Sequence, residues 1–197
     1  MPDDLSGTLE FLRLAERLKS TLRSAWTSEG QQESVAEHTW RLCLMAMVLR
    51  DRFPELDFSR LIRMLLVHDL GEAVHGDIPA PDQPAAPNKS LLERADLFQV
   101  LEPLSPALRG ELVALWDEYE AAFTPEARVA KGLDKLETIM QHNQGRNPAG
   151  FDYAFNLGYG RSYTTDDPRL AAIRALLDRD TEQRARDAGG PTEIRPS

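Results

Sequence analysis

Apolar residues recur every three or four positions in one segment after another, and this spacing constrains the fold more than any other feature of the sequence. Val129, Leu133, Leu136 and Met140, for example, follow a 4-3-4 spacing that places them on one face of a helix. No stretch alternates apolar and polar residues convincingly over the length of a strand. The sequence therefore predicts an all-α fold, a single bundle of six or seven helices. The expected helices cover residues 5 to about 19, 37 to about 51 and 60 to about 74, with four more around residues 91–98, 108–115, 129–140 and 170–177.

The length of the chain suits one domain. With 197 residues it is long enough to bury a sizeable core and lies within the usual range for a single domain. The segment 78–88 carries four prolines and cannot form the interior of a helix. Because the last residues are polar, we expect one domain over residues 1–187 and a polar tail over residues 188–197.

Charge and apolar content argue against several classes of partner. Lysine and arginine total 23, aspartate and glutamate total 32, and the net charge of −9 disfavours binding to nucleic acid polymers or anionic membranes. The longest apolar run, residues 42–49, is far shorter than the roughly 20 residues of a membrane span. The N-terminus lacks the features of a secretory signal. The single cysteine, Cys43, excludes an intrachain disulfide. We therefore expect a soluble, cytoplasmic protein.

Four polar residues stand where the apolar pattern predicts burial. His68 and Asp69 lie inside an apolar helical segment, His38 opens the preceding one, and Asp134 lies beside the apolar stripe of a later helix. A lone buried His–Asp pair is more often a core pair or an interface salt bridge, because a buried carboxylate needs a partner or a cation. Two imidazoles and two carboxylates from three helices also form a suitable ligand set for one divalent transition metal ion (Co, Mn, Fe, Ni or Zn). A generic helical bundle with scattered core pairs, which would bind no metal, is the alternative.

Two further carboxylates and one histidine follow the His–Asp pair. Glu72 comes three residues after Asp69 and four after His68, so a continuous helix would place all three on one face. Glu72 would then stand beside the metal ion, where it can accept a proton from a water whose pKa the metal lowers. His75, seven residues after His68, is expected to line the pocket and contact the substrate without binding the metal. Asp77 is a second candidate for acid–base work, although aspartate is also common in turns.

Three segments together resemble the HD-domain family of metal-dependent phosphohydrolases: ESVAEH, LLVHDLGEAVHGDIP and KGLDKLE. The likeness is to the small single-domain branch that includes the bacterial 5′-deoxynucleotidases and their eukaryotic relatives, and it runs from about residue 12 to about residue 141. The resemblance implies that one divalent metal ion is held by His38, His68, Asp69 and Asp134.

The same resemblance implies roles for four other residues. Glu72 matches a carboxylate proposed for acid–base work, and Asp77 matches a second active-site carboxylate. Arg23 matches an arginine that contacts the substrate in relatives, and Trp26 is the candidate for a tryptophan close to that arginine. These roles suit the residue types, since a guanidinium offsets phosphate charge and an indole ring can stack on a base or sugar.

Together these features predict a metal-dependent phosphohydrolase that cleaves (deoxy)ribonucleoside 5′-monophosphates to nucleoside and phosphate through a metal-activated water. The preference for deoxyribonucleotides comes only from the resemblance. The family often forms homodimers, so we expect one here. The aromatic-rich segment 151–163 is expected to form either a subunit contact or a lid over the pocket.

Two alternatives stay open at this point. An HD-type dinuclear phosphodiesterase or di-iron oxygenase needs further ligands, but His75 is the only histidine between Asp69 and Asp134. A non-catalytic metal-binding regulatory module is expected to have lost a ligand or the nearby Glu72, and this chain retains them all.

Overall fold

The computed structural model describes residues 5–78 and 88–189, and nearly all the regular structure in these ranges is helical. The helices of ten residues or more are α1 (Leu5–Ala15), α2 (Val35–Leu49), α3 (Phe58–Val67), α5 (Asn88–Leu101), α6 (Pro106–Ala121), α7 (Pro125–Gln144) and α10 (Pro168–Asp187). The single-turn helices are α4 (Glu72–His75), α8 (Phe155–Gly158) and α9 (Arg161–Thr164), with 3-10 turns at Glu16–Lys19 and Arg50–Arg52 and strands β1 (Leu22–Trp26) and β2 (Gln32–Ser34). The prediction of an all-α fold with six or seven helices is confirmed.

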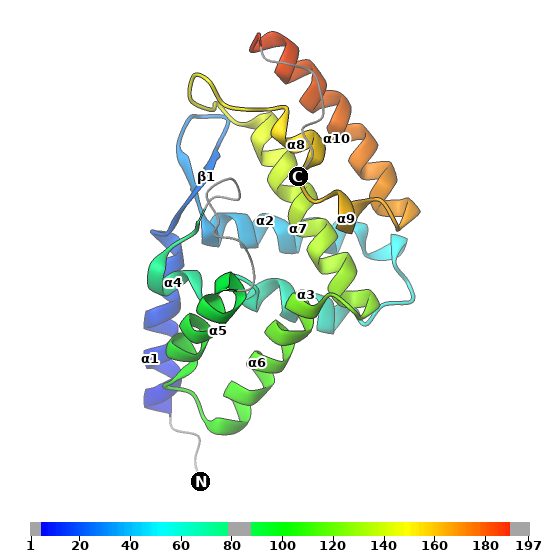
Figure 1. Cartoon of the computed structure of the whole chain (residues 1–197). Coiled ribbons are helices and arrows are strands. Elements are labelled where there is room, and N and C mark those ends of the chain that lie inside the picture. Colours follow the sequence, from blue (N-terminus) through cyan, green and yellow to red (C-terminus); the bar gives the residue numbers. More distant parts are fainter. Residues whose placement is uncertain (1–4, 79–87, 190–197) are drawn as a thin grey trace.

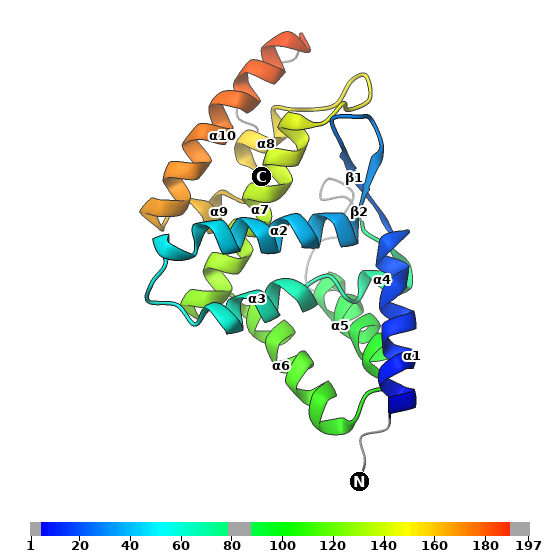
Figure 2. The same cartoon turned by 180° about the vertical axis from the view of Figure 1, so that it is seen from behind.

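Helix α7 forms the centre of the bundle. It packs against α2, α3, α6, α9, α10 and β1, and Figure 1 shows it running between the C-terminal helix α10 and the helices α3 and α6. Figure 2 shows α2 crossing α7 on the opposite side. One core cluster includes Leu97 and Leu101 of α5, and a second includes Leu42 of α2 and Leu133 of α7. Because α7 is covered on most sides, its residue Asp134 lies in the interior of the protein.

Local capping fixes where α2 and α7 begin. Ser34 and Glu37 form a capping box in which the Ser34 hydroxyl accepts from the Glu37 amide at 3.3 Å and the Glu37 carboxylate accepts from the Ser34 amide at 2.7 Å. This start places His38 in the first turn of α2. At α7, the Thr124 hydroxyl accepts from the Ala127 amide at 3.2 Å, and a proline occupies the first helical turn.

The sequence pattern did not predict the two-stranded antiparallel sheet. Strand β1 pairs with β2, with Leu22 opposite Ser34. The strand lacks the usual alternation because Arg23 and Ser24 are both half-buried. The hairpin, which lies beside the start of α2 in Figure 2, carries Arg23 and Trp26 toward the interior.

The helix expected over residues 60 to about 74 is interrupted, which corrects the prediction. Helices α3 and α4 lie on either side of a turn over residues 68–71. In this turn the backbone of Gly71 approaches α5 so closely that a Cβ atom there would lie 2.8 Å from the carbonyl oxygen of Glu93. The Leu70 amide donates to the Val67 carbonyl and the Glu72 amide donates to the Asp69 carbonyl, so i→i+3 bonds replace the α-helical pattern across the turn.

Two segments that the sequence singles out lie largely outside the described residues. Residues 79–87 of the proline-rich segment lie outside the described residues, and α5 begins immediately after them. Helix α10 ends at Asp187, and residues 190–197 of the expected tail also lie outside the described residues. Within the described ranges, no helix combines the length and the apolar content that a membrane span requires.

Gly132, in the middle of α7, packs too closely against its neighbours to admit a side chain. A Cβ atom at Gly132 would lie 2.6 Å from Leu170 Cδ1 and 2.8 Å from the carbonyl oxygen of Tyr163. We expect Gly132→Ala to lower the free energy of unfolding by about 1–3 kcal/mol, because α7, α9 and α10 must separate to admit the methyl group. Urea unfolding followed by circular dichroism measures the change. The matched control is Gly110→Ala in α6, where nothing lies within 4 Å of the added atom and stability should rise slightly; equal effects at the two glycines would contradict this account.

Candidate metal centre

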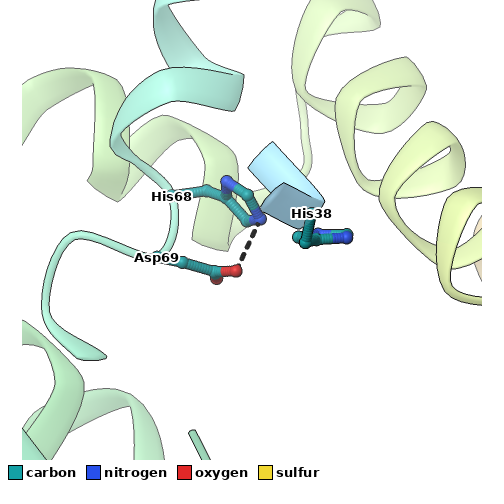
Figure 3. Close-up of side chains that lie close together, drawn as sticks. All are labelled: His38, His68 and Asp69. Carbon is teal, nitrogen blue, oxygen red and sulfur yellow. Dashed lines mark ion pairs between the residues drawn. The ribbon is translucent and has the colours of Figure 1, made fainter. Parts of the chain in front are cut away.

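The four predicted ligands come together from separate parts of the chain. His38 lies in the first turn of α2, His68 and Asp69 lie where α3 ends, and Asp134 lies within α7. The ligand atoms of His38, His68 and Asp69 lie within 4.8 Å of one another, and Figure 3 shows the three side chains converging. Asp134 joins this group through His38, whose Nε2 lies 3.2 Å from Asp134 Oδ1. The structure thus assembles the predicted set at one buried place.

The imidazoles of His38 and His68 each form a hydrogen bond through Nδ1 and none through Nε2. His68 Nδ1 donates to the carbonyl oxygen of Leu65 at 2.7 Å, and His38 Nδ1 donates to the carboxylate of Glu137. The two Nε2 atoms are buried, and neither has a hydrogen-bond partner, although each faces a ligand aspartate oxygen at 3.0 or 3.2 Å. An imidazole fixed in this tautomer presents its Nε2 lone pair to a metal ion. A divalent transition metal ion therefore fits the donor set.

The carboxylates of the set are kept charged. Asp134 Oδ2 accepts from Tyr119 Oη and from Lys135 Nζ, both at 2.8 Å, which leaves Oδ1 facing the imidazole. Burial opposes the charged form of Asp134, but Lys135 and the two histidines outweigh it and hold the pKa of Asp134 well below its usual range. Burial also opposes the charged form of Asp69, yet the neighbouring His68 lowers the pKa of that carboxyl. Metal binding requires this deprotonated form.

A second group of potential ligands, Glu33, His38 and Glu137, lies behind the first and shares His38 with it. Its carboxylates already have cationic partners. Arg41 donates to Glu137, and Arg23 Nε lies 3.6 Å from Glu33 Oε2. Burial, followed by the charge of Glu137, raises the pKa of Glu33 to about 7. Because both carboxylates are paired with arginines, we interpret this group as a support for His38, which Glu137 orients, and not as a second metal site.

A cavity of about 680 Å³ opens onto the ligands, and the two predicted acid–base residues line it. Burial, and after it the negative charges of Asp69 and Asp77, raise the pKa of Glu72 to about 10. One oxygen of Glu72, Oε2, is buried without a hydrogen-bond partner. Burial also raises the pKa of Asp77. The cavity therefore holds a neutral carboxyl group next to a charged ligand set, the arrangement that separates acid from base in many active sites.

Strand β1 supplies the two predicted substrate-binding residues. Arg23 Nη1 donates to Asp69 Oδ2 at 3.5 Å, and Nη2 donates to Thr138 Oγ1 at 3.2 Å. The Trp26 ring meets Phe151 edge to face, with centroids 6.5 Å apart and an interplanar angle of 86°. Both predicted residues line the cavity, with the guanidinium nearest the ligands.

Of the predicted site residues, His75 alone belongs neither to the group of candidate ligands nor to the lining of the cavity. Its side chain is 74% exposed, and Nδ1 lies 2.9 Å from Asp96 Oδ2. The prediction assumed a continuous α-helix from His68, but the turn over residues 68–71 is held by i→i+3 backbone bonds, and these do not keep the seven-residue spacing on one face. The geometry therefore gives no support to a substrate contact for His75.

Sequence reasoning gave no site role to His142, which lines the cavity together with residues of the segment 151–163. One wall of the cavity is aromatic and includes His142, Phe151, Phe155 and Tyr159. His142 Nδ1 lies 3.0 Å from Asn156 Oδ1, and its ring packs on Phe151 at 4.9 Å between centroids. Of the two roles expected for the segment 151–163, the position along the cavity supports that of a wall or lid. The cluster of aromatic residues in that segment was the available signal.

Glu137 is a second missed residue, and it carries a prediction. Since its carboxylate holds His38 through Nδ1, we expect Glu137→Gln to weaken metal binding by about 10- to 100-fold. Competition with a chelator of known affinity measures the change, with the exposed Glu182→Gln of α10 as the control. An unchanged metal affinity in folded Glu137→Gln protein would show that this contact does not orient His38 for the metal.

Comparison with known proteins adds independent evidence. The HD domain family model matches residues 15–174 of this chain. The protein named 5′-deoxynucleotidase HDDC2 from Mus musculus is 39% identical over 141 residues, which cover 71% of this chain and 70% of the mouse protein. The protein named 5′-deoxynucleotidase hdd1 from Schizosaccharomyces pombe is 35% identical over 137 residues, which cover 66% of this chain and 68% of the yeast protein.

Solved structures agree with the sequence comparisons. A crystal structure described as a predicted metal-dependent phosphohydrolase from Magnetospirillum magnetotacticum MS-1 superposes with a TM-score of 0.77 at 30% identity, covering 95% of this chain and 98% of that one. A conserved hypothetical protein from Pyrococcus furiosus gives a TM-score of 0.60 at 26% identity, covering 84% of this chain and 99% of that one.

Proposed function

Because this chain belongs to the HD-domain family, we propose that it is a metal-dependent phosphohydrolase that cleaves (deoxy)ribonucleoside 5′-monophosphates to nucleoside and phosphate. The observation that carries the proposal is the pair of buried, bare Nε2 atoms of His38 and His68, which face two aspartates at the end of a cavity. The names of the mouse and yeast relatives supply the substrate class.

A bound divalent metal ion would supply a water of lowered pKa and offset the charge of the phosphate. The chain's own residues then have two tasks. Arg23 is proposed to bind the phosphate oxygens. Its guanidinium contacts the ligand Asp69 and therefore lies beside the place where a metal-bound phosphate would be held. As the water oxygen bonds to phosphorus and the bond from phosphorus to the 5′ oxygen breaks, that oxygen needs a proton. Glu72 is proposed as its source, with Asp77 as a second proton-carrying group.

The aromatic wall is proposed to bind the nucleoside. A cavity of about 680 Å³ lies in the range of small-molecule sites, which combine apolar walls with a few polar groups. Trp26 and Phe151 offer ring surfaces for a base or sugar. Thr138 accepts a hydrogen bond from Arg23 Nη2 at 3.2 Å and so helps to position the guanidinium. Nothing in these contacts distinguishes a ribose from a deoxyribose, so the preference for deoxyribonucleotides rests on the relatives' names alone.

A substrate panel tests this proposal. The protein is stripped with a chelator, reloaded with Co²⁺, Mn²⁺, Fe²⁺, Ni²⁺ or Zn²⁺, and assayed for phosphate release from 5′-monophosphates of each nucleoside and deoxynucleoside. We expect release after reloading and little from the corresponding 3′-monophosphates. The ratio of deoxyribonucleotide to ribonucleotide rates settles the sugar preference. Failure to release phosphate from any 5′-monophosphate, in protein shown to contain metal, would reject the nucleotidase.

The number of metal ions separates the main proposal from the dinuclear alternative. The second group of potential ligands shares His38 with the first, and its carboxylates are held by Arg41 and Arg23. This arrangement favours a mononuclear site. Elemental analysis should therefore find one metal ion per chain, whereas two per chain would favour a phosphodiesterase or oxygenase. One ion per chain with no turnover of any phosphate ester would favour the regulatory module.

Homodimer formation is also part of the proposal. Four exposed apolar residues of α2 lie on one helical face, namely Trp40, Leu44, Met47 and Val48. Such a face is a suitable surface for a second copy of the chain. Light scattering of the wild-type protein and of Trp40→Glu tests this assignment, with a dimer expected only for the wild type. The cytoplasmic location and the absence of nucleic acid partners stay predictions from the sequence.

A further inference from the structure

Lys135 is a cation of the cavity that the proposed mechanism does not use. It follows the ligand Asp134 in α7, lines the same cavity and places Nζ 2.8 Å from Asp134 Oδ2. The aliphatic part of the Lys135 side chain packs against Tyr159 and Gly160. Gly160 packs so closely that a Cβ atom there would lie 2.6 Å from Lys135 Cβ and Cγ, and the Tyr159 ring centroid lies 5.3 Å from Nζ.

The two ligand aspartates are matched by two cations from different elements. Arg23 of β1 donates to Asp69 Oδ2 at 3.5 Å, and Lys135 of α7 donates to Asp134 Oδ2 at 2.8 Å. Each cation therefore contacts one of the two aspartates that would hold the metal ion. Both cations would then be available to a phosphate bound beside these aspartates.

Charge balance shows why a second cation is needed. Asp69 and Asp134 together balance a divalent metal ion, and the nearby carboxylate of Glu137 is balanced by Arg41. A phosphate monoester then adds about two negative charges to a buried site, and Arg23, which also faces Glu33 at 3.6 Å, offsets at most one of them. A buried charge without a partner is unfavourable.

The other lysines of the cavity are already paired with carboxylates that are not ligands. Lys131 Nζ lies 2.7 Å from Glu120 Oε1, and Lys89 Nζ lies 3.2 Å from Glu93 Oε1. Among the described lysines that line the cavity, only Lys135 is paired with a ligand carboxylate. A metal ion bound to Asp134 would neutralise the charge that Lys135 balances in its absence. Lys135 is then free to turn toward an incoming anion.

We propose that Lys135 is a second phosphate-binding cation. Lys135, beside Asp134, and Arg23, beside Asp69, would both bind the phosphate. The inference rests on the proposed function and deepens it by naming a residue that recognises a dianionic phosphate. A group that binds phosphate in this way contributes to the affinity for the product phosphate as well as for the substrate.

Calorimetry with inorganic phosphate, added to the metal-loaded full chain, tests the inference without relying on turnover. We expect Lys135→Gln to weaken phosphate binding by about 10- to 100-fold, since a charge-assisted contact is lost. Lys135→Arg should recover most of the affinity, and all variants should contain one metal ion per chain. The matched control is Lys131→Gln, one turn earlier on α7, which should keep phosphate affinity close to that of the wild type.

A second measurement uses the wild-type protein alone. The side-chain ammonium signals of lysine are followed by NMR during a phosphate titration, with the Lys135 signal assigned from Lys135→Arg. The Lys135 signal should shift on saturation. An unshifted signal, or unchanged phosphate affinity in Lys135→Gln, would overturn the proposal and leave Lys135 as a support for Asp134.

The outcomes also separate this inference from the proposed function. Wild-type protein that hydrolyses 5′-monophosphates while Lys135→Gln binds phosphate normally would reject only the role of Lys135. Wild-type protein that binds phosphate through Lys135 but hydrolyses no 5′-monophosphate would reject only the nucleotidase.

Discussion

Replacing Asp134 with alanine is expected to remove the bound metal ion and to lower phosphate release by on the order of 10³-fold or more. Asp134 is the metal ligand that we propose for α7, and its Oδ1 faces His38 Nε2 at 3.2 Å. Without this carboxylate the site loses one of the two negative charges that balance the metal. Metal content by elemental analysis and phosphate release from a 5′-monophosphate measure the two effects.

Two further variants make this result interpretable. Asp134→Asn keeps the size of the side chain and an acceptor for Tyr119, so it separates loss of charge from loss of packing. Asp180→Ala removes an exposed aspartate of α10 and should retain both metal and activity. Folded Asp134→Ala protein that keeps a full complement of metal, or more than a tenth of the activity, would contradict the assignment of this ligand.

Glu72→Gln is expected to lower kcat by about 10²- to 10⁴-fold while leaving metal content unchanged. Glu72 lines the cavity beside the ligands, and its buried Oε2 has no hydrogen-bond partner in the protein. With a pKa raised to about 10 by burial and neighbouring carboxylates, the group carries a proton at neutral pH. A bound cation acts in the opposite direction and brings the pKa closer to the working range.

Glutamine keeps the shape of Glu72 but can neither release nor accept a proton, so the loss should fall on kcat. Glu93→Gln is the matched control, since Glu93 lines the same cavity but is engaged with Lys89 at 3.2 Å. Equal losses of metal and activity in Glu72→Gln would identify Glu72 as a ligand. Activity within twofold of the wild type would show that Glu72 has no part in proton transfer.

The grouping of the four candidate ligands was predictable because its signals are local. His68 and Asp69 stand out as polar residues in an apolar segment, and the capping box of Ser34 and Glu37 marks the helix start that positions His38. Glu137 was missed, although it lies three residues after Asp134, on the same face of α7. A carboxylate at that spacing beside a ligand is a signal for a residue that orients another ligand.

Other features depend on contacts that no local pattern contains. The hairpin that carries Arg23 and Trp26 has half-buried polar residues because it lines a cavity, so it lacks a strand pattern. The turn after α3 packs closely against α5 at Gly71, and beyond this turn the exposed His75 lies against Asp96. Contacts of this kind become visible only when distant segments are brought together.

The most direct test of the central claim, metal-dependent hydrolysis of a nucleotide phosphomonoester by water, is turnover of a deoxynucleoside 5′-monophosphate in ¹⁸O-labelled water. Protein verified as metal-free is compared with the same protein after reloading, and the released phosphate is analysed by mass spectrometry. The account predicts release only after reloading, with one labelled oxygen per phosphate and none in the nucleoside. Release without metal, or label in the nucleoside instead of the phosphate, would contradict it.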